Sequence, residues 1–568
     1  MRSTFHGMET AKRALFAQRN ALDTTGHNIA NAERDGYTRQ KAHMSATSPY
    51  TMPAQNMPGT AGQIGTGVEV ESVERMRDDF IDSQIREESR FKGNWENKND
   101  TLKKIETLYT EPSDSGLRSV FDQFWESLQD LSKNPEDRTA RTQVMERGVS
   151  LADTVNHMYG QFVNLKEDLD ESIDIKVDEI NSIGHQIADL NEQIQNIELR
   201  TNQNANDLRD KRDMLLDELS ELTNYNLSED DKGNVRVSIG GTSLVEGNRV
   251  NELEFEAEAA DADNDNGNNE GNGNIYLDDQ EPRGGKVKWS HTGEEVNFRD
   301  GAMGGLMDSR DKIVQDHIDE LRSVMAQFQE SFNVVHSDDR AFNHYQAQAA
   351  QDGEDPFSDD VNQVDNFFEW KNDGNELLTV NEEIQEDVYL INAGYIDNDT
   401  LSEYLDGDYD DDDLSDMGLE DIFGDNYETQ EPENMDINPN KLMYRGNGEN
   451  GKRLANLKDE DIIKEVPSED NFDNDEKISG DTTFNDYIDA VVSDLGVEAQ
   501  EAERMVENQE LLVDQLENRR EAVSGVSMDE EMTKMVQQQH AYNAASRVVT
   551  TIDESLDTII NQMGIVGR

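Results

Sequence analysis

The sequence predicts an α+β protein whose N- and C-terminal segments form a long α-helical coiled-coil core, with β-rich outer domains inserted between them. Apolar residues recur every three or four positions at both ends of the 568-residue chain, which is the spacing of one helix face. Short alternating segments and glycine turns interrupt the helical pattern in the middle. Hydrophobic residues make up 34% of the chain, so much of it is surface, loop or thin helix.

The N-terminal segment is the first predicted helix. Its apolar stripe steps by three and four, through Met8, Ala11, Leu15, Gln18, Leu22, Thr25 and Ile29. The stripe ends before Asn31, and the Asp-Gly pair at 35–36 predicts a turn.

The C-terminal segment repeats this pattern. Its stripe contains Met528, Met532, Met535, Gln539, Tyr542, Ala545, Val549, Ile552, Leu556, Ile559 and Met563. Because such a stripe needs a partner and isolated helices are marginal in water, the economical arrangement pairs the first segment with the last. Two alternatives stay open here: copies of the chain continue this seam, or it closes as an ordinary intramolecular helical hairpin.

Further helices are predicted between the ends. Their stripes lie at 162–197, 306–335 and 488–516, with 208–219 as the antiparallel return or the continuation of the first of these. The glycine-rich residues 301–305 are expected to act as a breaker before the helix at 306–335.

The non-helical parts are short. Alternation at 235–239 before Gly240 and Gly241 predicts a strand that ends in a turn, and 378–380 is a second short strand-like piece. Residues 261–273 form a low-complexity loop rich in Asn, Gly and Asp. Residues 401–440 hold fifteen acidic residues and no Lys or Arg, which is typical of a solvated projection.

These elements divide the chain into three predicted domains. They are a terminal coiled-coil domain at 1–45 and 520–568, a helical-core domain at 46–345 and 471–519 with a small β insertion near 226–300, and an acidic, variable outer domain at 346–470.

The charge balance excludes two classes of partner. The chain has 51 Lys and Arg against 124 Asp and Glu, a formal charge of −73, so nucleic acid and anionic membrane surfaces repel it. Residues 1–41 carry seven basic and four acidic residues, and residues 516–568 carry five and eight. The two ends therefore sum to zero, which favours their burial in an assembly, while the acidic middle is typical of a protein from a salt-adapted bacterium.

No segment resembles a secretory signal, and no run of 18 apolar residues predicts a membrane helix. The absence of cysteine excludes disulfides and thiolate sites. Residues 261–272 differ from a calcium-binding loop because Asn266 and Asn272 replace its glycine and its last acid. Residues 446–452 differ from a phosphate-binding loop because Arg453 follows in place of Ser or Thr. We therefore expect no catalytic, cofactor or metal site and no enzymatic activity.

The two ends carry a family resemblance. Asn-Ile-Ala-Asn at 28–31 and Gly-Tyr-Thr-Arg-Gln at 36–40 resemble the N-terminal signature of the flagellar rod, hook and hook-associated protein family. Ala-Glu-Arg-Asp at 32–35 replaces the Thr-Pro part of that signature and lengthens it. Residues 65–68 and 75–80 look like the segment that follows this signature in the family, and segments similar to hook-associated members lie at 206–220, 305–311, 523–531 and 539–545.

The resemblance implies a structural protein that leaves the cell through the flagellar export apparatus and forms a ring at the hook–filament junction. The implied partners are copies of itself, the flagellar hook protein, a second hook–filament junction protein and an export chaperone that holds the C-terminal helix. The implied assembly interface contains Met8, Leu15, Leu22, Asn28, Ile29, Asn31, Gly36, Tyr37, Met528, Met532, Met535, Tyr542, Val549, Ile552, Leu556 and Ile559.

A hook or distal-rod protein is the alternative within the family, and the resemblance in the middle of the chain argues against it. A secreted cation-binding or degradative protein on a flagellar core is the alternative from another class. Its activity would lie in 346–470, where we find no metal cage and no catalytic pair.

Overall fold

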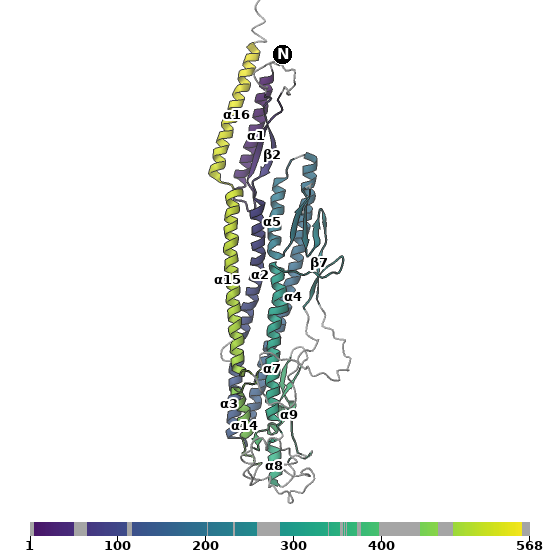
Figure 1. Cartoon of the computed structure of the whole chain (residues 1–568), viewed down its shortest axis with the longest axis vertical. Coiled ribbons are helices and arrows are strands. Elements are labelled where there is room, and N and C mark those ends of the chain that lie inside the picture. The colour runs from purple at the N-terminus through teal and green to yellow at the C-terminus, as the bar shows by residue number, and fades with distance from the viewer. Residues whose placement is uncertain are drawn as a thin grey trace, which may run out of the picture.

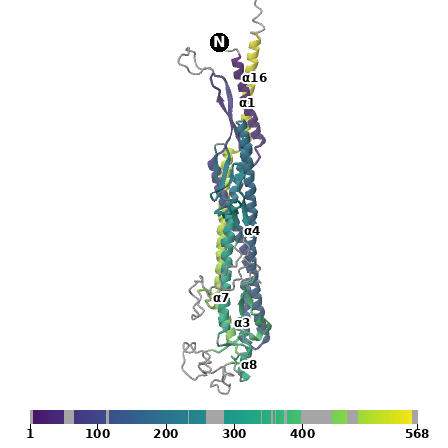
Figure 2. The ribbon, with the colours of Figure 1, turned by 90° about the vertical axis from the view of Figure 1, so that its right-hand side faces the viewer.

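A computed structural model describes residues 5–49, 65–110, 116–201, 203–230, 233–257, 284–338, 340–352, 356, 358, 361–371, 376–396, 443–463 and 481–558. The molecule is a long rod with two parts (Figures 1 and 2). One end, which we call the terminal body, contains α1 (His6–Ala30), α16 (Met528–Asp557), β1 (Gln40–Ala46) and β2 (Val68–Arg75). The remainder, the helical body, contains the long helices that surround the hydrophobic core.

The terminal body joins the two ends of the sequence. Helix α1 (His6–Ala30) packs along α16 (Met528–Asp557), which confirms the predicted pairing of the first and last segments. Strands β1 (Gln40–Ala46) and β2 (Val68–Arg75) form an antiparallel hairpin with a register shift between His43 and Met44. This hairpin packs against α1.

The helical body extends away from the terminal body. Helix α2 (Asp79–Thr110) packs along α15 (Phe484–Ser524), and α3 (Leu117–Lys133) packs on the 64-residue helix α4 (Arg138–Thr201). Helix α5 (Asn206–Leu222) returns along α4. Arg209 contacts Glu198 and Arg212 contacts Asn191, so α5 is antiparallel to α4.

The predicted break at 301–305 is wrong. These residues lie inside α6 (Gly301–Asp308), which continues through the π-helical turn η1 (Ser309–Val314) into α7 (Gln315–His336). A Cβ atom on Gly305 would lie 2.5 Å from the backbone oxygen of Asn94 in α2. The glycines are therefore needed for the close approach of two helices, and glycine content alone cannot tell this use from a break.

An aromatic cluster forms the centre of the core where α3, α7 and α15 meet. Phe121 lies 4.0 Å from Phe484 and 5.0 Å from Phe328, measured between ring centroids. The neighbouring side chains Phe124, Phe332 and Phe368 are also fully buried. Burying each large apolar side chain stabilises the fold by about 1.5–3 kcal/mol, so this cluster is a main contributor to the stability of the helical body.

Small antiparallel sheets lie against α4. Four strands follow the order β3 (Asn226–Glu229), β4 (Val235–Ile239), β5 (Thr242–Glu246) and β6 (Arg249–Val250), and β7 (Leu253–Glu256) pairs with β8 (Lys286–Trp289). The predicted strand at 235–239 and its glycine turn are confirmed, since Gly240 and Gly241 have φ values of 59° and 95°. The predicted loop at 261–273 lies outside the described residues.

Parts of the 346–470 range belong to the same core. Strands β10 (Phe368–Trp370) and β11 (Leu378–Val380) form a hairpin that contacts α7 and α4. The remaining short elements are β9 (Ala341–Phe342), α8 (His344–Asp352), α9 (Glu382–Glu386), η2 (Val388–Leu390), β12 (Gly394–Tyr395), α14 (Glu449–Asn456) and η4 (Leu457–Asp459). Helix α14 packs on α3 and α7. The acidic stretch 401–440 lies outside the described residues, so the outer-domain boundary stays a prediction.

Candidate assembly interface

The seam between α1 and α16 is antiparallel and narrow. Thr25 Oγ1 donates a hydrogen bond to Gln538 Oε1 at 3.0 Å. Near the other end of the seam, a Cβ atom on Gly7 would lie 3.2 Å from Ile552 Cδ1. The buried residues of the two helices are small or polar, namely Ala11, Ala17, Ala21, Thr25, Asn28 and Glu531.

No large apolar side chain of α1 or α16 is buried among the described residues. Each buried alanine contributes little more than one methyl group, whereas ordering a residue costs about 1–2 kcal/mol of backbone entropy. This seam alone therefore supplies little of the free energy needed to hold two helices of 25 and 30 residues.

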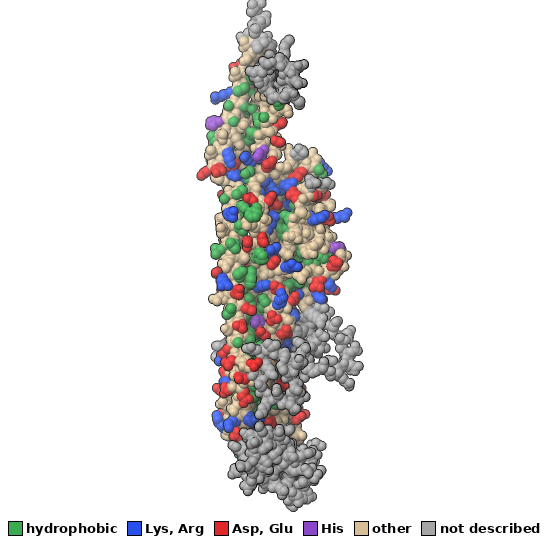
Figure 3. All heavy atoms as spheres, viewed as in Figure 1, with side chains coloured by type: hydrophobic (Ala, Val, Ile, Leu, Met, Phe, Trp, Pro, Cys, Tyr) green, Lys and Arg blue, Asp and Glu red, His purple; other side chains and the backbone are tan. Residues whose placement is uncertain are grey.

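Large apolar side chains of the terminal body are exposed instead. Phe16 is 55% exposed on α1, and Met532 and Val536 are 56% and 51% exposed on α16. Figure 3 shows apolar side chains in several places along the visible face of the terminal and helical bodies. These exposed apolar side chains are accessible for contact with another protein.

The predicted interface residues fall into four groups. Half-buried beside the seam centre of α1 are Met8, Leu15, Leu22 and Ile29. Half-buried on the inner side of α16 are Met535, Val549, Ile552 and Leu556. Exposed on α16 are Met528, Met532 and Tyr542. At the turn after α1, Asn28 is buried, Asn31 and Tyr37 are half-buried and Gly36 is exposed. Ile559 lies outside the described residues. The predicted stripe included the buried Ala11 and Thr25 of the α1 seam but missed Ala17 and Ala21.

Asn28 connects three segments at the base of the terminal body. Its Oδ1 accepts hydrogen bonds from the Tyr37 hydroxyl at 2.8 Å and the Gln40 backbone N–H at 2.9 Å. Its Nδ2 donates to the Gln40 carbonyl oxygen at 2.9 Å and to Glu531 Oε2 at 3.0 Å. One amide thus fixes α1, the chain reversal after it and α16. Burial, followed by the nearby carboxylates of Asp207, Asp210 and Glu531, raises the pKa of Tyr37 well above its usual value.

A row of acidic residues on α5 forms ion pairs with arginines at the end of β2 and just after it. Asp210, Asp213 and Asp217 are spaced by three and four residues, so they share one face of the helix. Arg75 Nη1 lies 2.9 Å from Asp210 and 2.6 Å from Asp213, and Arg77 Nη1 lies 2.6 Å from Asp213. We call this set, with the residues of the next paragraph, the arginine–aspartate ladder.

Two more arginines complete the ladder at Asp217. Arg86 of α2 lies 2.7 Å from Asp217 Oδ1, and Arg520 of α15 lies 2.7 Å from Asp217 Oδ2. The ladder therefore ties β2, α2 and α15 to α5. Burial raises the pKa of Asp213, but Arg77 and Arg75 lower it more, so its net pKa lies below the usual value.

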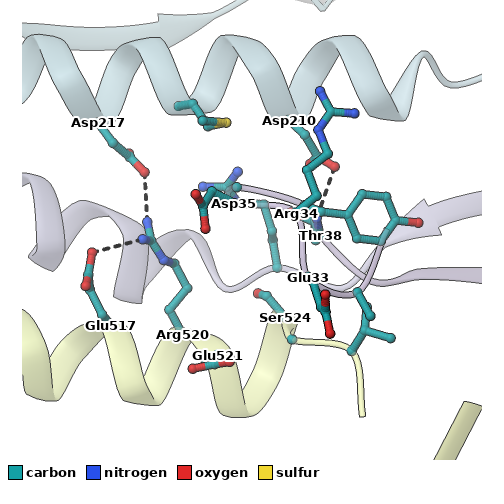
Figure 4. Close-up of a pocket in the computed structure, with 17 residues that line it drawn as sticks. Glu33, Arg34, Asp35, Thr38, Asp210, Asp217, Glu517, Arg520, Glu521 and Ser524 are labelled. Carbon is teal, nitrogen blue, oxygen red and sulfur yellow. Dashed lines mark hydrogen bonds and ion pairs between the residues drawn. The ribbon is translucent and has the colours of Figure 1, made fainter. Parts of the chain in front are cut away.

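An open cleft of about 640 Å³ lies beside the ladder (Figure 4). Arg520 of α15 reaches across it to Asp217 of α5 and also contacts Glu517 of its own helix. The inserted residues Glu33, Arg34 and Asp35 form part of its wall. Its lining is mostly charged, which suits a joint between two bodies rather than a site for an apolar small molecule.

The joint requires a glycine at position 36. Gly36 has a φ of 70°, and a Cβ atom there would collide with the side chain of Met214. The Arg39 N–H donates to the Ser524 carbonyl oxygen at 2.8 Å. The chain reversal after α1 is thereby held against the end of α15.

The described residues contain no group of three or more His, Asp or Glu side chains suited to a metal ion. Within the same part of the chain, no helix combines the length and the apolar character needed to cross a bilayer. Four of the sequence segments that carry the family resemblance, at 28–40, 75–80, 206–220 and 523–531, meet at this joint.

Known proteins are similar in sequence to this chain along its whole length. The chain is 32% identical over 578 aligned residues to flagellar hook-associated protein 1 of Bacillus subtilis (strain 168), and the match covers 100% of both chains. The chain belongs to the flagellar hook-associated protein 1 family. It is therefore a structural component of the bacterial flagellum and not an enzyme.

Other comparisons agree with this family. The chain is 24% identical to flagellar hook-associated protein 1 of Salmonella typhimurium, over 97% of this chain and 98% of the relative. Residues 102–349 match the flagellar hook-associated protein FlgK helical domain. Residues 8–38 match the flagella basal body rod protein family, and residues 521–563 match the flagellar basal body rod FlgEFG protein C-terminal family.

A solved structure shows the same fold. It is the flagellar hook junction protein FlgK from Burkholderia pseudomallei, with a TM-score of 0.52 and 15% identity, covering 78% of this chain and 100% of that chain. The α+β fold with a helical core, predicted from the sequence, is confirmed.

Proposed function

We propose that the chain forms a ring that joins the flagellar hook to the filament, and that copies polymerise through α1 and α16. One observation carries this proposal: the terminal pair leaves its large apolar side chains half-buried or exposed, and the residues that it buries fully are Ala11, Ala17, Ala21, Thr25, Asn28 and Glu531. A helix pair with so little internal burial gains its missing contacts from neighbouring subunits.

The distribution of charge supports the same proposal. Residues 1–41 and 516–568 together carry twelve basic and twelve acidic residues, so the formal charge of −73 belongs to the residues between them. Copies packed side by side through strongly acidic surfaces would repel one another. Neutral ends allow close packing in a tube, while the acidic middle faces solvent.

The partners follow from the place in the flagellum. The B. subtilis and S. typhimurium relatives are named hook-associated, and the Burkholderia neighbour is described as a hook junction protein. We infer contacts with the hook protein on one side of the ring and with a second hook–filament junction protein on the other. Export through the flagellar apparatus, with a chaperone covering α16 before assembly, fits a helix whose apolar side chains are exposed in the monomer.

The three predicted domains remain part of this proposal. Residues 1–45 and 520–568 form the inner tube, residues 46–345 and 471–519 surround it, and residues 346–470 form the outermost part. The joint at Asn28 and the arginine–aspartate ladder lies near the boundary of the first two.

Complementation of a strain that lacks this gene tests the proposal. The full chain should restore attached filaments, whereas chains without 1–40 or without 525–568 should leave hooks bare and filament protein in the medium. Electron microscopy of hooks and circular dichroism of the purified truncated chains give the two readouts. A truncated chain that still attaches filaments would refute the proposal. Loss of the hook itself in the deletion strain would instead support the alternative, a hook or distal-rod protein.

A further inference from the structure

Two short crossings connect the terminal body to the helical body. Residues 76–78 lie between β2 and α2, and residues 525–527 lie between α15 and α16. Figures 1 and 2 show the two bodies end to end, with these crossings where the bodies meet. A few residues at the ends of elements can absorb a change of angle between two rigid parts, so the joint has the construction of a hinge.

Polar contacts join the two bodies. Gln40 Nε2 donates a hydrogen bond to Asp207 Oδ1 at 2.8 Å, and Asn206 Nδ2 donates to the Val73 carbonyl oxygen at 3.0 Å. Within the described residues, the hydrophobic core takes its side chains from the helical body alone. Bending at the joint therefore leaves that core intact, and water can replace the hydrogen bonds that break.

The cleft of about 640 Å³ beside the arginine–aspartate ladder gives the joint room to close. Residues 33–35, in the turn after α1, form one wall, and the end of α15 forms another (Figure 4). Arg75 at the end of β2 and Arg77 in the crossing are both held on Asp213 of α5. The ladder is therefore the pivot, and residues 33–35 are on the side that can move toward α15.

The two walls carry charge of the same sign. Residues 33–35 hold two carboxylates and one guanidinium group, and α15 lines the cleft with Glu517, Arg520 and Glu521. Each wall is therefore negative by one charge. Since like charges repel, the walls resist closure of the cleft.

The carboxylates on the two walls differ from those of the ladder in their partners. Arg520 binds Asp217 at 2.7 Å. Among the residues drawn in Figure 4, no ion pair is formed by Glu33, Asp35 or Glu521. All three are exposed, so dissolved ions can screen them.

Salt acts unequally on the cleft and on the pivot. The Debye length falls from about 10 Å at 0.1 M ionic strength to about 3 Å at 1 M, and partly buried ion pairs are screened much less than exposed charges. Arg75 and Asp213 are each only 15% exposed and lie 2.6 Å apart. Raising the salt concentration therefore removes the repulsion across the cleft and leaves the pivot in place.

We propose that the joint is a salt-responsive hinge, in which the cleft between residues 33–35 and the end of α15 is open at low ionic strength and closes at high ionic strength. The hinge belongs to the single chain, so it goes beyond the proposed junction function and does not depend on it. The angle between the terminal body and the helical body, and with it the shape that the chain offers to other subunits, then follows the salt concentration.

The absence of cysteine allows spin labels to be placed in chosen pairs. Ala30→Cys is at the exposed end of α1, and Asn518→Cys is at an exposed position of α15 beside the cleft. Pulsed electron paramagnetic resonance measures the distance between the two labels on the purified full chain at about 0.1 M and about 1 M NaCl. We expect the distance to be shorter by several ångströms at the higher concentration.

Neutral side chains on the walls should remove this response. Glu33→Gln, Asp35→Asn and Glu521→Gln are combined in one chain, which should show the short distance at both salt concentrations. The matched control removes as many exposed acids from α15 away from the cleft and should respond to salt as the wild-type chain does: Asp494→Asn, Glu498→Gln and Glu507→Gln.

Two further measurements separate hinge closure from other changes. Labels at Gln186→Cys and Asn508→Cys, which are exposed positions of α4 and α15 within the helical body, should keep their distance at both salt concentrations. Circular dichroism under the same conditions should show constant helix content.

Three results would overturn the hinge. They are a distance between Ala30→Cys and Asn518→Cys that does not change with salt, a neutral-wall variant that responds as strongly as the wild-type chain, and shortening that is accompanied by loss of helix content. Complementation in cells tests the junction function separately, so attached filaments together with a salt-independent distance would overturn the hinge and leave that function standing.

Discussion

Asn28 Nδ2 donates a hydrogen bond to Glu531 Oε2 at 3.0 Å, across 503 positions of sequence. Glu531 is 2% exposed, and its other oxygen lies 2.8 Å from Lys534 Nζ. A buried carboxylate is stable only where donors satisfy it. A directional hydrogen bond therefore joins the first and last helices of the chain. The other fully buried side chains of this seam are small.

Replacing Asn28 with Ala should loosen the terminal body. Tyr37, Gln40 and Glu531 each lose a hydrogen-bond partner, which we expect to cost about 2–3 kcal/mol. Amide hydrogen exchange should accelerate in α1 and α16 but stay unchanged in α4, and fewer hooks should carry filaments. Asn20→Ala, at an exposed position of α1, is the control. Equal exchange in both variants would contradict the role of Asn28.

The arginine–aspartate ladder should stabilise the helical body. Asp213→Asn removes the charge that Arg75 and Arg77 share at 2.6 Å, so two partly buried cations each lose one of their two carboxylate partners and keep only Asp210 and Asp82, respectively. We expect the free energy of unfolding to fall by about 3 kcal/mol in urea titrations. Glu218→Gln, at an exposed position of the same helix, should change it by no more than about 0.5 kcal/mol. A similar small change for Asp213→Asn would refute the ladder as a stabilising contact.

Replacing each of two helical glycines with alanine should change the stability of the protein in opposite directions. Gly305→Ala forces α6 away from α2, because the new Cβ would lie 2.5 Å from the Asn94 oxygen, and we expect a loss of about 2 kcal/mol. Gly160→Ala in α4 meets no atom within 4 Å and should stabilise the protein by about 1 kcal/mol. Thermal unfolding of both variants measures this difference, and equal melting temperatures would contradict the close approach of α6 to α2.

His336 should make stability depend on pH. Burial lowers the pKa of His336 to about 4. Its Nδ1 lies 3.0 Å from the Asp365 carbonyl oxygen, and its Nε2 accepts a hydrogen bond from the Asn392 N–H at 3.1 Å. The unfolded chain, with a histidine pKa of about 6.5, takes up a proton more readily than the folded protein. The contribution of His336 is therefore fully present above pH ~6.5 and is lost as the pH falls toward ~4.

Urea unfolding between pH 7 and 4.5 measures this effect. The wild-type chain should lose on the order of 3 kcal/mol more than His336→Asn across this range. Protonation of carboxylates lowers the stability of the wild-type chain and of His336→Asn equally, so it cancels in the difference between them. Parallel pH profiles for the two chains would show that His336 does not titrate on unfolding.

Periodicity predicted the long helices because their apolar stripes are regular. The stripes at 162–197 and 488–516 lie within α4 and α15, and the return at 208–219 lies within α5. Helices α2 and α3 were not predicted, although α3 buries Phe121, Phe124 and Trp125. In α2 the buried apolar residues Ile81 and Ile85 are separated from Leu102 and Ile105 by a mainly polar stretch, so the helix has no continuous apolar stripe.

The candidate interface could be predicted only in part. The stripe through Met8 and Leu15 placed α1 correctly and included the buried Ala11 and Thr25, but it missed Ala17 and Ala21, where it placed the neighbouring larger side chains instead. The ladder could not be predicted at all. Its members, such as Arg75 and Asp210, are 135 positions apart, and pairing across that distance is set by the fold and not by local spacing.

Hydrogen exchange of the chain before and after assembly tests the central claim most directly, namely that the terminal pair is completed by other subunits. In the purified monomer, amides of α1 and α16 should exchange quickly while those of α4 stay protected. In isolated hook–filament junctions, protection of α1 and α16 should rise to the level of α4. Terminal helices as protected in the monomer as α4, with no change on assembly, would contradict the account.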